Sequence, residues 1–192
     1  MSELNKEQKE TAMFFNGICA VIAVPGSGKT RTMTERIGYL VKEYGVPPEN
    51  ILGLTFTRNA AETMRLRLKP VLNELASRVN LSTIHSFCYY LLRNEGKTFE
   101  ILSGKDQIIF VRKIIQQLRL KGLSIGMVLR EISLAKNNLI TVDEFKALYE
   151  GDRTMLKVAD VYESYDREKE KRLLLDFDDL LMHAYKLLKE NK

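Results

Sequence analysis

The chain of 192 residues contains no tryptophan, only two cysteines and no long hydrophobic run. Cys19 and Cys88 are too few for the disulfide framework of a small secreted protein, so we expect a reducing compartment, the cytoplasm. The longest apolar run, Ile18 to Val24, is far shorter than the roughly 20 residues that a membrane-spanning helix needs. The polar start, Met1 to Glu10, does not resemble a signal peptide. We therefore expect no membrane partner.

What the chain does contain is typical of an ordered globular protein. Apolar residues make up 45% of it, and charged residues make up 29% with both signs present. This balance excludes a disordered chain, because there is enough apolar surface to bury a core. The formal net charge of +5 suits a polyanionic partner. Many ordinary proteins share that surplus, so it does not identify one.

Short apolar segments alternate with helical patterns over the first half of the chain. Ile18 to Val24 (ICAVIAV) is apolar at every position, which predicts a strand buried on both faces of a parallel sheet. Ile51 to Phe56 and Val79 to Ile84 predict two further strands. A capped helix from Asn5 comes first, and a helix follows each strand, over Lys29 to Glu43, Arg58 to Ser77 and His85 to Arg93. Such alternation predicts a parallel α/β sheet.

The pattern changes after Asn94. From Gly104 to Lys171 apolar residues recur at helical spacing and no convincing strand appears, which predicts an all-helical insertion. The charge run Asp166 to Arg172 is interpreted as a solvated helix end. Asp176 then caps a final amphipathic helix that reaches Lys189. We predict an α/β core of residues 1–94 plus 174–192, with residues 95–173 as the inserted subdomain.

The core assignment rests on a candidate phosphate loop, Ala23 to Thr30 (AVPGSGKT). It follows a predicted strand and opens a predicted helix, which is the context that such a loop requires. Its glycines let the backbone wrap phosphates, and the helix N-terminus adds positive charge. Lys29 would reach the β- and γ-phosphates, and the Thr30 hydroxyl would ligate Mg²⁺, so these two are the predicted catalytic residues. ATP and Mg²⁺ are the expected ligands of Ala23, Val24, Pro25, Gly26, Ser27, Gly28, Lys29 and Thr30.

Two strand-to-helix junctions indicate a second site. Phe56 lies at the carboxyl end of a predicted strand, where open α/β sheets bind ligands, and could stack on a nucleic-acid base or pack in the core. Arg58 opposes the dipole of the helix that it starts, which favours a contact with phosphate. His85 and Cys88 have the spacing of metal ligands. Too few partners exist elsewhere in the sequence for a zinc site.

Several segments together resemble the UvrD/Rep/PcrA-type DNA helicases of superfamily 1. Leu4 to Gln8 (LNKEQ) resembles that family's Q motif, whose glutamine recognises adenine, although Gln8 could instead be only a helix cap. The family's phosphate loop usually starts with alanine, as here at Ala23, but Val24 stands where it usually has glycine. Arg31 matches the basic residue that follows the loop near the nucleotide.

The resemblance also implies contacts with single-stranded DNA. Ile51 to Leu68 resembles motif Ia, and Ser82 to Phe87 (STIHSF) resembles motif Ib. The family usually has Asn-Lys where this chain has Arg58-Asn59, so the basic charge is kept but moved by one position. The implied DNA-binding residues are Phe56, Thr57, Arg58, Asn59, His85, Ser86 and Phe87.

The resemblance implies a P-loop NTPase core of the RecA-like type, domain 1A, with a 1B insertion. Leu175 to Leu181 resembles the segment in which the family's chain returns from the insertion. Leu173 to Asp176 could be read as a strand ending in a Mg²⁺-binding acid. It follows a charge run directly, however, and Asp176 makes a good first helical turn. We expect the family's Asp-Glu pair, and its second motor domain, beyond Lys192.

These features predict the N-terminal part of an ATP-dependent DNA helicase and translocase. The resemblance implies 3′ to 5′ movement on single-stranded DNA or at a duplex–single-strand junction, together with the second motor domain. ATP hydrolysis is not expected from this part alone. Two alternatives stay open: the motor part of a helicase–nuclease, and a non-catalytic module that binds ATP and DNA.

Overall fold

The computed structural model describes residues 4–190 and contains two compact units, Met1–Phe87 and Cys88–Lys192. The boundary between them falls inside helix α4 (Ile84–Asn94). The mixture of helices with small parallel sheets agrees with the predicted α/β class. The division into core and insertion made from the sequence stays a prediction. Over the described residues, no helix is both long and apolar enough to cross a membrane.

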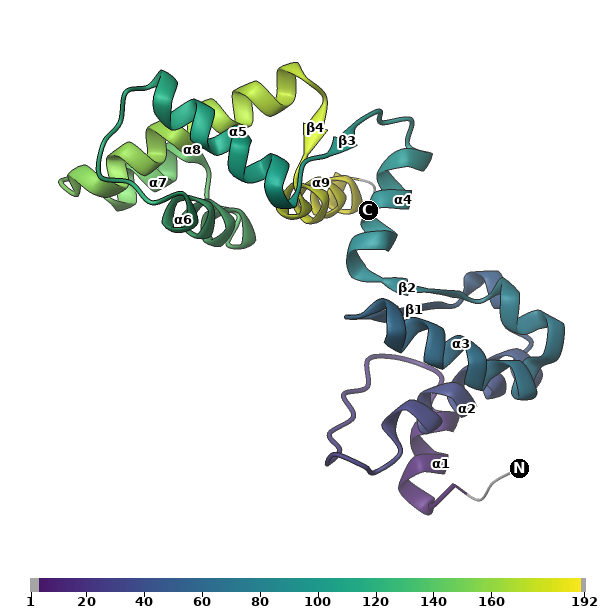
Figure 1. Cartoon of the computed structure of the whole chain (residues 1–192). Coiled ribbons are helices and arrows are strands. Elements are labelled where there is room, and N and C mark those ends of the chain that lie inside the picture. The colour runs from purple at the N-terminus through teal and green to yellow at the C-terminus, as the bar shows by residue number, and fades with distance from the viewer. Residues whose placement is uncertain (1–3, 191–192) are drawn as a thin grey trace. The chain divides into compact units, whose positions relative to one another are not determined.

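The first unit begins with a helix pair, α1 (Lys6–Met13) packed on α2 (Lys29–Lys42) (Figure 1). The start of α1 is the predicted capping box: the Gln8 backbone N–H donates to Asn5 Oδ1 at 2.8 Å, and the Asn5 N–H donates to Gln8 Oε1 at 3.0 Å. This reciprocal pair satisfies two N–H groups that have no partner within the helix. It fixes Gln8 in the first turn of α1.

The sheet of the first unit pairs β1 (Leu52–Thr55) in parallel with β2 (Asn80–Thr83). Helix α3 (Arg58–Leu72) connects them through a short 3₁₀ helix, Asn73–Arg78, and another 3₁₀ turn, Pro48–Asn50, precedes β1. Both strands match their predictions within two residues at each end. The core of this unit is formed by buried residues of α2, α3 and the two strands: Ile37, Ile51, Met64, Leu68, Leu72, Ala76, Val79 and Leu81.

The prediction of a buried strand over Ile18 to Val24 is wrong in this structure. The segment has no regular secondary structure, and the side chains of Ile18 and Ile22 are almost fully exposed. A strand that is apolar on both faces needs neighbours on both edges and a layer on each face. The described sheet of this unit pairs only β1 with β2, so the segment finds no such place.

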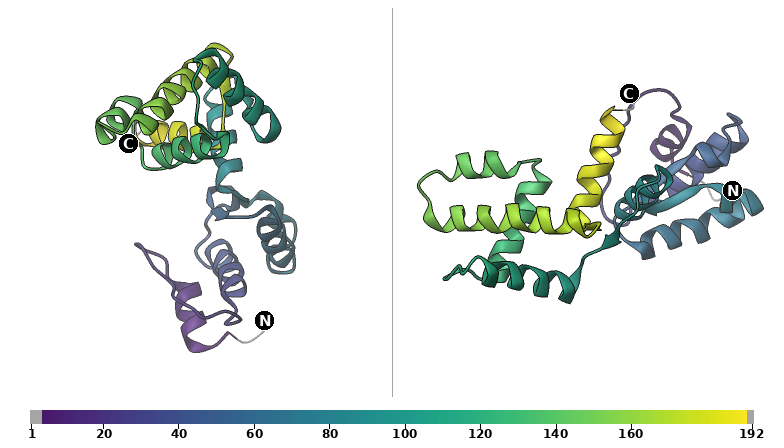
Figure 2. Two further views of the ribbon diagram at one scale, coloured as in Figure 1. Left: turned by 60° about the vertical axis from the view of Figure 1, so that its left-hand side comes forward. Right: turned by 90° about the horizontal axis from the view of Figure 1, so that it is seen from above.

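The second unit is helical, as the spacing of its apolar residues predicted. It contains α5 (Gly104–Gln117), α6 (Ile125–Asn137), α7 (Val142–Leu148), α8 (Arg153–Lys171) and α9 (Phe177–Glu190), with a minimal parallel pair of β3 (Glu100–Ile101) and β4 (Leu174–Leu175). Helix α8 packs against both α5 and α7 (Figure 2). The largest side chains in its core are fully buried tyrosines, Tyr162 and Tyr165.

A buried ion cluster joins three segments of the second unit. The ammonium groups of Lys136 and Lys169 each lie 2.9 Å from Asp176 Oδ2 and also contact Asp179, and both lie 3.1 Å from Asp166 Oδ1. Both lysines are almost completely buried. The prediction that the charge run around Lys169 is a solvated helix end is therefore wrong at that residue.

The cluster shifts proton equilibria in both directions. Burial alone would raise the pKa of Asp176, but the two lysines outweigh it and hold that pKa well below its ordinary range. Burial alone would lower the pKa of Lys136, but the carboxylates outweigh it and raise that pKa. Asp176 also caps α9 as predicted, since its Oδ1 accepts from the Asp179 N–H at 2.8 Å. With these partners, Asp176 acts as a structural acid in this unit.

Candidate nucleotide and DNA site

The candidate phosphate loop is a tight turn between the extended segment before it and helix α2. Gly26 and Gly28 have φ of +81° and +84°, in the left-handed region that glycine adopts without strain. Gly28 is the N-cap of α2, and its carbonyl accepts from the Thr32 N–H at 2.9 Å. The loop therefore delivers the chain to a helix N-terminus, where backbone N–H groups and the helix dipole favour an anion.

Lys29 lies over this loop. Its Nζ donates to the carbonyl oxygens of Ala23 and Val24, at 3.0 and 2.9 Å, and the Ser27 N–H donates to Val24 O at 3.3 Å. The hydroxyl of Ser27 is a buried polar atom with no hydrogen-bond partner among the described residues. An ammonium above the loop, left-handed glycines and a buried hydroxyl that still has bonding capacity fit a phosphate group.

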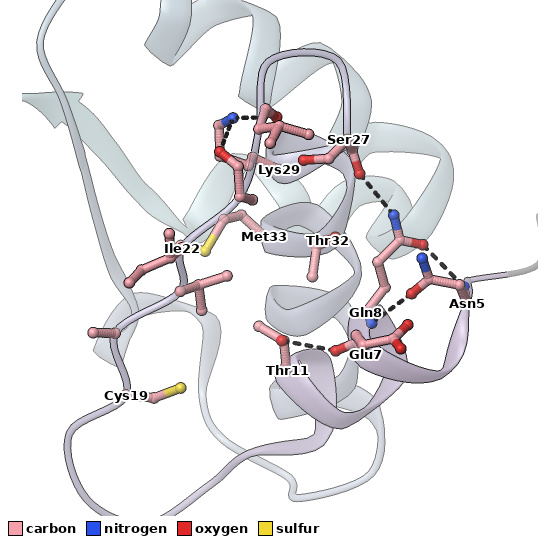
Figure 3. Close-up of a pocket in the computed structure, with 14 residues that line it drawn as sticks. Asn5, Glu7, Gln8, Thr11, Cys19, Ile22, Ser27, Lys29, Thr32 and Met33 are labelled. Atoms are coloured by element: carbon pink, nitrogen blue, oxygen red, sulfur yellow. Dashed lines mark hydrogen bonds between the residues drawn. The ribbon is translucent and has the colours of Figure 1, made fainter.

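Gln8 approaches the loop from helix α1. Its Nε2 donates to the carbonyl oxygen of Ser27 at 2.9 Å, across 19 residues of sequence (Figure 3). A Cβ built on Gly28 would lie 3.1 Å from the same nitrogen, a tight contact that adds to its φ of +84° in favouring glycine here. The structure thus connects the predicted adenine-recognition residue to the predicted phosphate loop by a direct hydrogen bond.

A cavity of about 710 Å³ lies beside these groups, which is within the usual size range of small-molecule sites. Figure 3 shows its lining side chains, which come from α1, α2 and the segment that precedes the loop. Sequence reasoning missed several of them because exposed cavity walls leave no periodic signal. The lining residues are Asn5, Glu7, Gln8, Thr11, Cys19, Ala20, Val21, Ile22, Ala23, Val24, Ser27, Lys29, Thr32 and Met33.

The remaining predicted nucleotide residues lie on or next to the loop. Thr30 and Arg31 are half-buried in the first turn of α2, and Pro25 and Val24 are exposed on the loop. Val24 is 71% exposed, and it places an isopropyl group where the family that the sequence resembles usually has glycine. The described residues contain no cluster of three or more metal-ligating side chains. One hydroxyl beside a polyphosphate is nevertheless the protein contribution that a P-loop makes to Mg²⁺.

The predicted DNA residues form two groups at one edge of the β1–β2 sheet. Thr55 is paired with Thr83 in the parallel register, so the segments that follow the two strands leave the sheet side by side. Phe56 has 90% of its surface exposed and is therefore not a core residue. Thr57 caps α3, since its Oγ1 accepts from the Ala60 N–H at 3.1 Å.

The two basic and polar residues after the cap, Arg58 and Asn59, are exposed in the first turn of α3. At the start of α4, the Thr83 hydroxyl donates to Ser86 Oγ at 2.9 Å, which gives Ser86 a structural contact. His85 and Phe87 are half-buried on the same turn. At this edge the exposed side chains of Phe56 and Arg58 follow β1, and the half-buried side chains of His85 and Phe87 follow β2.

Comparisons with known proteins show which family the chain is similar to. Residues 4–192 match the family model described as the UvrD/REP helicase N-terminal domain. The chain is 37% identical over 195 residues to the ATP-dependent DNA helicase PcrA of Bacillus subtilis, covering 97% of this chain and 26% of that protein. The proteins of the same name from Staphylococcus epidermidis and Staphylococcus aureus are 33% and 34% identical, with 97% of this chain and 27% of each protein covered.

The chain thus spans about a quarter of the length of these curated relatives. The family model covers nearly all of the chain, including the loop, Gln8 and the carboxyl ends of β1 and β2. The chain belongs to the UvrD/REP helicase N-terminal domain family.

Proposed function

We propose that this chain is the ATP-binding and single-stranded-DNA-binding part of an ATP-dependent DNA helicase that moves 3′ to 5′. The observation that carries the proposal is the loop from Ala23 to Lys29, which has left-handed glycines, a lysine above it and a cavity beside it. Membership of a helicase family and relatives named ATP-dependent DNA helicases support it. A RecA-like core that is completed by a second motor domain is part of the same proposal.

Each residue of the loop contacts a different part of Mg·ATP. Lys29 exchanges its contacts with the carbonyls of Ala23 and Val24 for contacts with the phosphates, which offer it charged acceptors. The N–H groups at the start of α2 hold phosphate oxygens, and Thr30 holds Mg²⁺. When bound, Mg²⁺ neutralises charge that develops during phosphoryl transfer. Gln8 contacts the base, and Arg31 lies close to the nucleotide.

DNA crosses the edge at the carboxyl ends of β1 and β2. Phe56 stacks on a base, because every base has a π-face and this ring is free. Arg58 contacts phosphate, with Asn59, His85 and Phe87 beside the path. Stacking and phosphate contacts read no base edges, so binding is independent of sequence.

Hydrolysis by this chain alone is expected to be negligible. Phosphoryl transfer depends on positioned charge, and the buried acid at the end of a short apolar strand, Asp176, is already paired with two lysines. ATP is therefore expected to bind without sustained turnover. Steady ATPase activity of the purified chain that Lys29→Ala abolishes would contradict this part of the proposal.

Calorimetric titration of Mg·ATP tests the central claim. Lys29→Ala is expected to weaken binding at least about 10-fold, because a hydrogen bond to a charged group contributes about 1.5–3 kcal/mol. Lys42→Ala is the matched control, since Lys42 is an exposed lysine at the other end of the same helix. If both variants bound Mg·ATP as tightly as the wild type, the loop would not be the nucleotide site.

A further inference from the structure

The side-chain amide of Gln8 is held at both ends by the protein. Nε2 donates to Ser27 O at 2.9 Å, and Oε1 accepts from the Asn5 N–H at 3.0 Å. The first bond reaches the phosphate loop and the second belongs to the capping box of α1. Gln8 is therefore more than a residue beside the cavity, because its amide joins the helix start to the loop (Figure 3).

The bond to Ser27 orients a peptide group of the loop. In a trans peptide the carbonyl oxygen and the following N–H point in opposite directions, and the chain has no cis peptide bond among its described residues. Holding the Ser27 carbonyl towards α1 therefore turns the Gly28 N–H away from α1. Gly28 caps α2, so its N–H belongs to the set of donors that a phosphate would meet.

The amide also keeps bonding capacity after these two contacts. A glutamine amide has two N–H donors and an oxygen with two lone pairs, and the contacts described use one donor and one lone pair. The remaining donor and acceptor match the N7 acceptor and N6 donor of adenine, which glutamine contacts in a bidentate manner. One amide can therefore contact the base without releasing the loop.

We infer that Gln8 is a positioning residue for the phosphate loop as well as a contact for the base, so that the base and phosphate subsites share one side chain. The inference rests on the proposed function, because it concerns the same nucleotide site. It requires that loss of the Gln8 amide weakens binding of a polyphosphate that carries no base. A glutamine that only recognises adenine has no such effect.

Calorimetric titrations of Mg·ATP and Mg·tripolyphosphate against three chains separate the two roles. Gln8→Met keeps the length of the side chain and its neutral charge, and removes the bond to Ser27. Asn5→Ala is the matched control, because it removes half of the capping box and leaves the Gln8 amide in place. Gln8→Met is expected to weaken tripolyphosphate binding about 2- to 12-fold, the range for one net hydrogen bond, and to weaken ATP binding further. Asn5→Ala, at a residue that also lines the cavity, is expected to weaken tripolyphosphate binding less than Gln8→Met does, with melting temperatures confirming that all three chains fold.

Each other result overturns the inference. If Gln8→Met lowered ATP affinity alone, Gln8 would serve only the base; if Asn5→Ala weakened tripolyphosphate equally, the helix start and not the amide would be responsible. A wild-type chain that bound neither ligand would remove the proposed function too, so the two failures are distinguishable. Should Gln8→Met not fold, Gln8→Asn keeps a neutral amide on a side chain that is one methylene shorter, so it adds no charge beside the loop and withdraws the donor from Ser27. It must show the same loss of tripolyphosphate binding.

Discussion

The second unit buries two tyrosines and two lysines completely or almost so, whereas the first unit leaves Phe56 and Ile22 almost fully exposed. In the second unit, large and charged side chains satisfy one another inside a helical core. In the first unit, loop donors, a free ring and an apolar segment face outward. The difference indicates where ligands bind. Polar groups that are already paired within the protein are not available to a ligand, whereas exposed apolar and polar groups are.

The largest expected effect sharpens this comparison at the buried cluster. Lys136→Met removes a cation that contacts Asp176 and Asp179 and is expected to cost about 3–5 kcal/mol of unfolding free energy, because buried charge is left uncompensated. Lys146→Met is the control, since Lys146 pairs with Glu163 on the surface and should cost no more than about 1 kcal/mol. Urea unfolding followed by circular dichroism measures both. Equal losses for the two variants would show that the buried cluster contributes no more than a surface pair.

The same cluster predicts a pH window for the stability of the second unit. Asp176 has a depressed pKa in the folded chain, so its contribution is complete above the unfolded value of about 3.9 and is lost as pH falls below it. Lys136 has a raised pKa, so its contribution is complete below about 10.4 and is lost as pH rises through the folded value. Between these limits the melting temperature of the wild type is expected to change less with pH than it does below pH 4. A Lys136→Met chain with the same acid-side slope would contradict this origin.

Phe56→Ala is expected to have the next largest effect and concerns the exposed side of the comparison. Loss of a stacking partner weakens binding of single-stranded DNA by about 1–3 kcal/mol, with little change in its dependence on salt. Because the ring is 90% exposed, stability should change by no more than about 0.5 kcal/mol. Fluorescence titration of a labelled oligonucleotide at low salt provides the measurement. Unchanged affinity would remove Phe56 from the DNA path.

Arg58→Ala should act through charge and not through stacking. Removing one phosphate contact reduces the slope of log affinity against log salt by about 0.7 for single strands. Lys69→Ala is a suitable control, because Lys69 lies in the last turn of the same helix, α3, far along it from the proposed path. Equal slopes for wild type and Arg58→Ala would place the phosphates elsewhere.

The smallest expected effect is on stability at the loop itself. Lys29 is exposed, and the two bonds that it makes to loop carbonyls are accessible to water, so Lys29→Ala should change unfolding free energy by only about 0.5 kcal/mol without nucleotide. A large fall in melting temperature would instead mark Lys29 as structural. That result would break the comparison, because the loop would then stabilise the first unit rather than serve a ligand.

Local patterns in the sequence predicted what depends on neighbours along the chain. The Asn5–Gln8 capping box, the helices of the second unit and the paired strands β1 and β2 all follow from short-range spacing. The prediction of a strand over Ile18 to Val24 was wrong because a strand also depends on neighbouring strands, which its own residues do not specify. The prediction that Lys169 is solvated was wrong for the same reason. Its partners Asp176 and Asp179 lie 7 and 10 residues further along the chain, beyond the end of α8.

Within the candidate site, the left-handed turn at Gly26 and Gly28 and the start of α2 at Lys29 could be predicted from the spacing of the glycines. The binding of phosphate by this loop stays a prediction. The bond from Gln8 to Ser27 could not be predicted, because it joins positions 19 residues apart through a side-chain rotamer. The exposure of Phe56 lay between the two cases. Its position at a strand end was readable, but whether a neighbouring element covered the ring was not.

The exposed run from Ile18 to Val24 also has a consequence for handling the chain in solution. It is uncharged, free of proline and rich in β-branched residues, which is the composition of segments that self-associate as extended strands. At high protein concentration such segments recruit copies of themselves, so light scattering should rise with concentration well before the helical unit loses its fold. Ile18→Lys adds a charge to this run at a residue outside the cavity lining, and it should delay the self-association.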